Sequence, residues 1–120
     1  MSVLSVQTLA FTGLNYTSAA ASVADSFVND GRTFLVFTNG NASARTLTIA
    51  ANATSRPGFG SIATPSTTVT IPGSGTNGGL CMVGPFPTER FNDITTGKVS
   101  YTVDVVTSLT VAAVKLQSYV

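Results

Sequence analysis

The side chains that could do chemistry are few in this chain. Only 9% of its 120 residues are charged, five are acidic, one is cysteine and none is histidine. Enzymes move protons and attack electrophilic carbon mostly with His, Asp, Glu, Lys and Cys. Glu89 and Asp93 lie close together in a segment expected to be irregular, but a glycosidase pair also needs an aromatic sugar cleft, and the chain has no tryptophan. We therefore expect no catalytic residue and no enzyme activity.

Three other features have the composition of a ligand site without its pattern. Gly73–Gly79 lacks the Lys-Ser/Thr pair that completes a phosphate-binding loop, so we expect a flexible hairpin loop there. Asn29–Gly31 and Asn92–Asp93 do not have the spacing of an EF-hand calcium loop, and Asx turns at strand ends are their expected role. Cys81 lies in an apolar run, which indicates a buried thiol with no histidine to activate it. The sequence thus predicts no metal and no cofactor.

Composition also limits the class of protein. A chain of this length can form one domain around one core, here residues 1–120, and its 43% of hydrophobic residues is close to a globular average. The net charge is +1 and the cationic residues are spread singly, so no nucleic-acid partner is expected. We see no secretory leader and no apolar run near the ~20 residues of a membrane helix. We therefore expect synthesis in a cytoplasm and no membrane partner.

Alternation of apolar and polar residues with a period of two predicts β-strands. It is clearest at Arg45–Ala51, Thr67–Ile71 and Lys98–Asp104, where Thr or Ser faces outward. Thr33–Thr38 and Ser108–Leu116 are apolar on both faces, as expected of central strands whose second cover could be another subunit. Counting all runs gives about seven to eight strands. We predict an all-β chain with a single antiparallel β-sandwich or jelly roll, and an open barrel is the alternative.

The connections are less well specified than the strands. Asn39–Asn41 has turn chemistry, and the short loop predicts a hairpin between Thr33–Asn39 and Arg45–Ala51. Ser5–Phe11 fits either a first strand or an extended N-terminal arm. Tyr16–Asn29 fits either a short alanine-rich helix or an exposed loop.

Four residues in the loops are candidate contacts with a partner. Phe59 and Phe86 lie in Gly/Pro-rich segments, where each could anchor a partner or plug the end of the sandwich. Glu89 and Arg90 are neighbours, which fits a surface ion pair or an intersubunit contact.

Several segments carry a resemblance to a known family when they are taken together: residues 29–40 (Asn-Asp-Gly-Arg-Thr-Phe-Leu-Val-Phe-Thr-Asn-Gly), 67–71, 83–87 (Val-Gly-Pro-Phe-Pro), 91–93, 98–102 and 108–116. In this order they resemble small structural proteins of tailed bacteriophages, in particular head decoration (cement) proteins built as β-sandwiches. The resemblance covers about Asn29 to Leu116. The longer Ser55–Pro65 segment departs from what we expect of the family.

The resemblance implies a virion protein on the outer surface of a phage capsid. It would be made in the host cytoplasm, form a homo-oligomer, in the usual case a trimer, and bind the major capsid protein after the shell expands. The family carries no catalytic residues to transfer. It does imply an N-terminal arm, here Met1–Phe11, that bridges neighbouring capsomers; the candidate contacts in that arm are Val3, Leu4, Val6, Leu9 and Phe11.

Two other functions fit the same sequence. One is a different phage structural module, such as a tail, adaptor or fibre-base protein, for which a sixfold ring would be the distinguishing sign. The other is a carbohydrate-binding β-sandwich, which would present an exposed aromatic platform.

Overall fold

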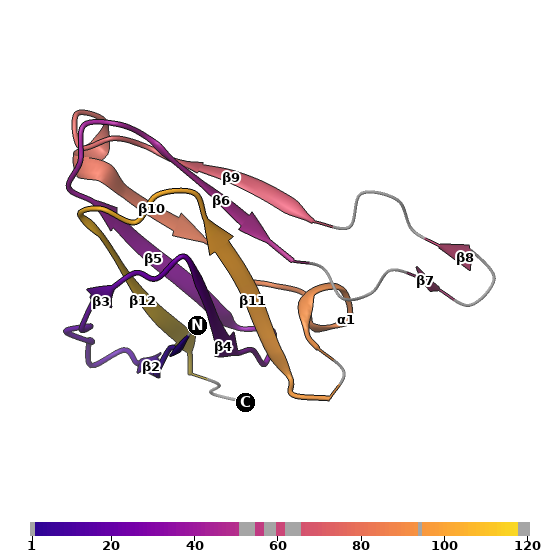
Figure 1. Cartoon of the computed structure of the whole chain (residues 1–120). Coiled ribbons are helices and arrows are strands. Elements are labelled where there is room, and N and C mark those ends of the chain that lie inside the picture. Colours follow the sequence, from indigo (N-terminus) through magenta and orange to yellow (C-terminus); the bar gives the residue numbers. More distant parts are fainter. Residues whose placement is uncertain (1, 51–54, 57–59, 62–65, 94, 118–120) are drawn as a thin grey trace.

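Strands make up most of the described chain. The computed structural model describes residues 2–50, 55–56, 60–61, 66–93 and 95–117 (Figure 1). Its strands are β1 (Ser2–Val3), β2 (Val6–Leu9), β3 (Ala19–Ala20), β4 (Ala24–Val28), β5 (Thr33–Asn39), β6 (Arg45–Ile49), β7 (Ser55–Arg56), β8 (Gly60–Ser61), β9 (Thr67–Ile71), β10 (Leu80–Val83), β11 (Lys98–Val103) and β12 (Leu109–Leu116). A 3-10 turn, η1 (Asn77–Gly79), and one helical turn, α1 (Thr88–Phe91), interrupt them.

Two large sheets face each other. The first sheet has the strand order β1-β4-β11-β6-β9, and the second has the order β10-β5-β12-β2, with β3 also paired to β12. Most neighbours are antiparallel, whereas β1 runs parallel to β4 and β2 runs parallel to β12. The short β7–β8 pair lies away from both sheets (Figure 1). The chain is therefore almost all β, and its two sheets are compatible with the predicted β-sandwich.

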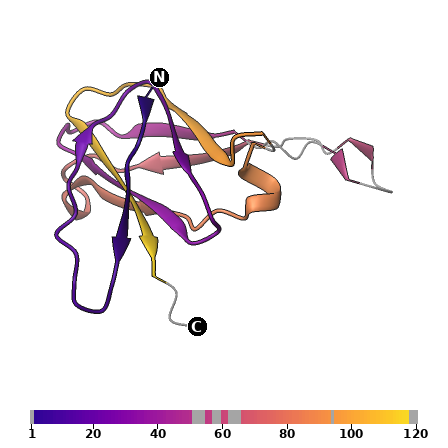
Figure 2. The same ribbon diagram turned by 90° about the horizontal axis from the view of Figure 1, so that it is seen from below.

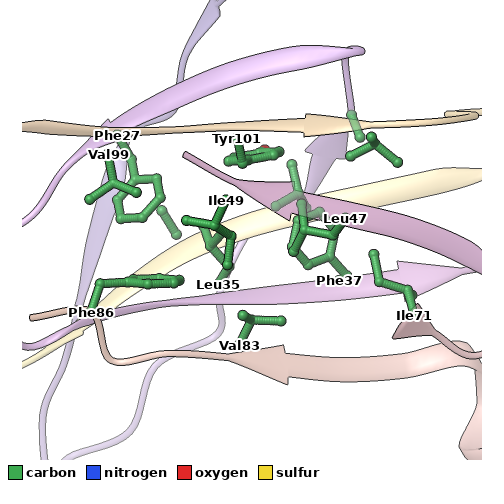
Figure 3. Packing of buried hydrophobic residues seen from close by; sticks show 14 of the residues in the cluster. Phe27, Leu35, Phe37, Leu47, Ile49, Ile71, Val83, Phe86, Val99 and Tyr101 are labelled. Atoms are coloured by element: carbon green, nitrogen blue, oxygen red, sulfur yellow. The ribbon is translucent and has the colours of Figure 1, made fainter. Parts of the chain in front are cut away.

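The core lies between the sheets and is built from the inward-facing residues of each strand. Figure 3 shows the side chains of the two sheets meeting there. Phe37 of the second sheet packs edge-on against Tyr101 of the first, with ring centroids 5.7 Å apart. Such T-shaped pairs add to the free energy that burial alone provides. Of the alternating residues expected to face inward, Val69 is half-buried against the core and the others are buried, namely Leu47, Ile49, Ile71, Val99, Tyr101 and Val103.

The predicted hairpin between Thr33–Asn39 and Arg45–Ala51 is wrong. Both strands exist, but β5 pairs with β10 and β12, whereas β6 pairs with β9 and β11. The buried Asn39 side chain holds the crossing between sheets, because its Nδ2 donates to the carbonyl oxygens of Ser43 (2.8 Å) and Pro72 (3.1 Å). The Gly-rich run Gly73–Gly79 likewise joins β9 to β10 in opposite sheets and is not a hairpin loop.

Strand β4 also departs from the prediction, which allowed a helix or an exposed loop over Tyr16–Asn29. Its residues pair with β11, and Asp25, Ser26 and Phe27 are buried. The Asp25 carboxylate is solvated by protein groups: Oδ2 accepts hydrogen bonds from the Tyr101 hydroxyl (3.2 Å) and from the Ser22 backbone N–H (3.1 Å). A buried carboxylate breaks the apolar alternation, so the strand left no clear signal in the sequence.

The N-terminal residues are built into both sheets. Ser2–Val3 extends the first sheet, and Val6–Leu9 extends the second beside β12. Between them, the Leu4 N–H donates to the Ser26 carbonyl oxygen at 2.8 Å. Of the two readings of Ser5–Phe11, the structure shows a strand over Val6–Leu9. Residues 2–9 thus close one side of the molecule and do not form an arm that extends away from it (Figure 2).

Two asparagines join the loops at one end of the core. Asn29 Nδ2 donates to the Phe86 carbonyl oxygen (2.9 Å) and to Asn92 Oδ1 (2.7 Å). Asn92 Nδ2 in turn donates to the carbonyl oxygens of Asn29 (2.8 Å) and Gly97 (3.2 Å). Asn29 Oδ1 also accepts from the Gly31 N–H at 3.0 Å, which is the predicted Asx turn. This network holds the Phe86 segment and α1 against the end of β4.

Removing the Asn29 amide should destabilise the fold. In Asn29→Ala, the Phe86 carbonyl and the Gly31 N–H lose their partner in a buried site, so we expect the free energy of unfolding to fall by about 2–3 kcal/mol. Urea denaturation measures this change. Asn15→Ala, at an exposed position, is the matched control and should change the free energy by less than about 0.5 kcal/mol. Equal effects of the two variants would contradict the structural role of the network.

Tyr101 should give stability a defined dependence on pH. Burial, together with the nearby Asp25 carboxylate, raises the pKa of the Tyr101 hydroxyl above its usual value. The unfolded chain therefore loses this proton first, at about pH 10, and stability that is complete below that pH falls by about 1.4 kcal/mol per pH unit above it. Urea unfolding on both sides of this pH measures the slope. Tyr101→Phe should flatten it, and an unchanged slope in that variant would argue against the assignment.

Candidate protein-binding surface

The outer surface of the second sheet is apolar. Its strands point Phe34 and Val36 (β5) and Ala112 and Val114 (β12) away from the main core, where they form a separate apolar cluster. On β10, Met82 is paired with Val36 and Leu80 with Thr38, so both side chains share this outer surface. We call it the outer apolar face and define it by Leu9, Leu14, Phe34, Val36, Leu80, Met82, Ala112, Val114 and Leu116.

The chain itself covers part of this face. The loop that joins β2 to β3 places Leu14 against the cluster, and Leu9 of β2 packs there as well. The Gln7 amide holds the loop in place, because its Nε2 donates to the Thr17 carbonyl (2.9 Å) and its Oε1 accepts from the Thr17 N–H (2.8 Å). The second cover, which the sequence allowed to be another subunit, is thus supplied in part by residues of the same chain.

The remainder of the outer apolar face is open. Met82 is 66% exposed, Leu80 37% and Leu116 44%. Leu116 also lines a shallow hollow of about 380 Å³ together with Leu9 and Phe11. The residues that define the face carry no charge, and Arg32, whose carbonyl oxygen accepts from the Leu116 N–H, lies beside its Leu116 end.

The candidate contacts in the N-terminal segment have different surroundings. Leu4 and Val6 pack against the main core, and Leu9 packs against the outer cluster. Val3 is 56% exposed and Phe11 is 87% exposed. Only Val3 and Phe11 of this set therefore present most of their side chain to the surface.

Phe86 is not a surface contact. It is 3% exposed, and its ring lies 5.5 Å from Phe27 and 5.7 Å from Phe91, measured between centroids. Its position is that of a plug over the end of the core, the other reading that the sequence allowed (Figure 3). Phe59, the second candidate, lies outside the described residues.

Arg90 connects α1 to the first sheet. Its guanidinium Cζ lies 5.0 Å from the centroid of the Phe91 ring, and Nη2 donates to Thr67 Oγ1 at 3.2 Å. Arg90 is exposed, so these contacts place a cation at the surface near the start of β9. Glu89 lies in the same helical turn, and its side chain falls outside the described part of the structure. The ion pair that the sequence suggested between them therefore stays a prediction.

A groove of about 460 Å³ lies between the N-terminal strand and β3. It forms because β3 pairs with Thr110–Val111 of β12, while β2 begins its pairing at Ala113. Its lining is apolar and neutral polar: Val3, Leu4, Ser5, Gln7, Thr17, Ala19, Ala20 and residues 111–113. No residue of this lining is charged, so the groove offers no ionisable side chain.

The surroundings of Asp30, Asp93 and Cys81 fit a structural role for these side chains. The Arg32 backbone N–H donates to Asp30 Oδ1 at 2.9 Å and lowers the pKa of that carboxyl, and the Thr95 N–H donates to Asp93 Oδ1 at 2.7 Å. These are Asx turns, as predicted. Burial raises the pKa of the Cys81 thiol, which is half-buried against the core. Such a thiol stays protonated and is a weak nucleophile.

The described residues contain no group of three or more His, Cys, Asp or Glu side chains that could hold a metal ion. Nor does any helix among them have the length and hydropathy needed to span a bilayer.

Comparison of the chain with family models, with curated proteins and with solved structures found no match. The functional interpretation therefore depends on the surface itself and on the resemblance carried by the sequence.

Phe86 and Phe11 should respond differently to truncation. Phe86→Ala removes a buried ring and should lower the free energy of unfolding by about 3–5 kcal/mol. Phe11→Ala, at an exposed position, should lower it by less than about 1 kcal/mol. Urea denaturation of both variants makes the comparison. A small effect at Phe86 would place its ring outside the core.

Proposed function

We propose that this chain is a virion structural protein that decorates and stabilises the outer surface of a phage capsid. It would act by associating with itself and by binding the major capsid protein. The observation that carries the proposal is the open part of the outer apolar face, where Leu80, Met82 and Leu116 are exposed. The resemblance to head decoration proteins supplies the biological setting.

Physical chemistry favours contact with protein for such a surface. Contiguous exposed apolar patches mark interaction sites, and covering them yields about 25 cal/mol per Å² of apolar area. The centres of interfaces are depleted of charged residues. The net charge of +1 also means that many copies can gather on one shell with little mutual repulsion.

Connections between the two sheets suit the fold to a protein that stabilises a shell mechanically. The N-terminal residues join both sheets on one side, and the paired amides of Asn29 and Asn92 tie the loops at one end. Such cross-connections resist separation of the sheets. We propose that the protein works by adhesion and stabilisation, without a reactive centre.

Two finer parts of the proposal concern architecture and assembly. Consecutive strands β4 and β5, β5 and β6, and β11 and β12 lie in opposite sheets, which favours the jelly-roll type. The strand pair β6–β9, in contrast, stays within one sheet. The trimer and the capsomer-bridging role of the N-terminal residues remain predictions from the resemblance, with Val3 and Phe11 as the exposed candidates.

The two other functions that fit the sequence can be distinguished from capsid decoration. A tail or adaptor protein would share the same surface chemistry and differ in symmetry. A carbohydrate-binding sandwich would use stacked rings, and the loop between β2 and β3 does expose Phe11 (87%) and Tyr16 (43%). That loop has one apolar role already, since Leu14 covers the outer cluster, so capsid decoration is the function we favour.

Binding to phage heads tests the proposal. We expect the purified chain to co-sediment with expanded heads of the phage that encodes it, to saturate at a fixed number of copies per capsomer, and to bind unexpanded precursor heads less. Phe11→Lys should weaken binding about tenfold or more, because burying a Phe side chain is worth about 1.5–3 kcal/mol.

Val23→Lys is the control for that experiment. It introduces the same charge at a position that is 58% exposed but lies next to the first sheet, so binding should not change. Failure of the wild-type chain to bind expanded heads would reject the decoration function.

A further inference from the structure

The two sides of the molecule differ in the strands that form the sheet edges. On one side, the N-terminal strands β1 and β2 extend the first and second sheets. On the other side, β9 ends the first sheet and β10 ends the second, and neither has a further partner strand among the described residues. A free strand edge presents unpaired backbone N–H and C=O groups that can pair with another strand. Native proteins usually guard such edges with charged residues, proline or a bulge.

Neither edge strand is guarded by its own sequence. Strand β9 (Thr-Thr-Val-Thr-Ile) and strand β10 (Leu-Cys-Met-Val) contain no charged residue and no proline. They differ in their outer side chains. Thr68 and Thr70 of β9 turn hydroxyl groups to the surface, whereas β10 exposes Leu80 and Met82. Only at β10 does a free backbone edge coincide with exposed apolar side chains.

Strand β10 is also held in a fixed position. Each of its residues pairs with β5, from Leu80 opposite Thr38 to Val83 opposite Leu35. Gly79, just before the strand, has a φ of +74° and approaches the Asn39 backbone so closely that a side chain there would collide with it. A preformed edge of this kind loses little conformational entropy when another strand pairs with it.

We infer that β10 pairs antiparallel with β10 of a second copy of this chain, across a two-fold axis, so that the two second sheets become one continuous sheet. This inference rests on the proposed function only in that decoration requires self-association, and the two-fold pair that it specifies differs from the trimer that the resemblance implies. In an isologous contact the same patch meets itself, so a charged patch would repel its copy. The absence of charge on β10 makes self-pairing free of that cost, and the exposed Leu80 and Met82 provide the burial.

The side chains select one register. Directly opposite residues of an antiparallel pair lie on the same face of the sheet. Centring the pair on Cys81 places Leu80 opposite the partner's Met82 on the outer face, and does the same for the symmetry-related pair. Both exposed apolar side chains of β10 are then covered, and the outer apolar faces of the two copies become continuous. Cys81 meets the partner's Cys81 on the inner face.

The mass in solution tests the pairing. Size-exclusion chromatography with light scattering should give the mass of two chains for the wild type. Met82→Lys and Leu80→Lys place a charge on the edge strand and should raise the dissociation constant at least about tenfold, so that monomers prevail on dilution. Val105→Lys, at a position that is 43% exposed between β11 and β12, is the matched control and should keep the mass of the wild type. Thermal unfolding followed by circular dichroism confirms that each variant is folded.

Oxidation of Cys81 tests the register of the β10–β10 pair. Opposite Cβ atoms in an antiparallel pair are about 4.5–5.5 Å apart, close to the separation that a disulfide spans. Mild oxidation should therefore link two wild-type chains, a product visible on a non-reducing gel. Cys81→Ser should abolish the link and keep the mass of two chains, and Met82→Lys should abolish both. A dimer that gives no link on oxidation would overturn the register.

The results separate the pairing from the decoration function. A wild-type mass of one or three chains, or Lys variants with the mass of the wild type, would overturn the β10 pairing even if the chain binds heads. A pair that is broken by the β10 variants supports it even if the wild type ignores heads, in which case the decoration function alone falls.

Discussion

The pairing of β5 with β12 is the constraint on which the rest of the structure depends. The two strands are in register from Thr33 opposite Lys115 to Asn39 opposite Leu109, and they form the centre of the second sheet. Their inner side chains fill the core, and their outer side chains form the second cluster. Because both faces are apolar, the sheet needs cover on both sides: the first sheet supplies one, and the β2–β3 loop with Leu9 and Leu14 supplies part of the other.

Where backbone pairing stops at the ends of the strands, buried Asn side chains form hydrogen bonds with the backbone groups. Asn39 satisfies two carbonyl groups where the chain crosses from β5 to β6, and Asn29 with Asn92 satisfies the carbonyls around Phe86. An Asn side chain has two N–H donors and a carbonyl acceptor. It can therefore hydrogen-bond backbone groups of a turning segment that has no partner strand. In an interior with few charges, these amides and the Asp25–Tyr101 pair replace salt bridges as the polar links between distant segments.

The outer surfaces of the two sheets differ in chemistry, and this difference indicates which sheet would contact a partner. The first sheet faces outward with hydroxyl groups in register across neighbouring strands, with Thr48 between Thr102 and Thr68 and with Thr46 beside Thr70. Such a face is readily hydrated. The second sheet faces outward with Val36, Met82 and their neighbours, whose exposure is unfavourable in water. A protein that acts by contact would therefore meet its partner with the second sheet.

The sequence by itself determined the class of fold and the positions of β5, β6, β9, β11 and β12, because alternation of apolar and polar residues reports directly which face of a strand is buried, as at Leu47 and Val99. Only the tertiary structure decided which strands are neighbours, since alternation is the same whether β5 turns back on β6 or crosses to the other sheet. It also revealed β4, whose buried Asp25 hides the pattern, and it decided between the two readings of Phe86 by placing its ring at the end of the core. The outer apolar face brings together residues as distant as Leu9, Met82 and Leu116, which no local pattern connects, because their proximity exists only after the sheets have formed.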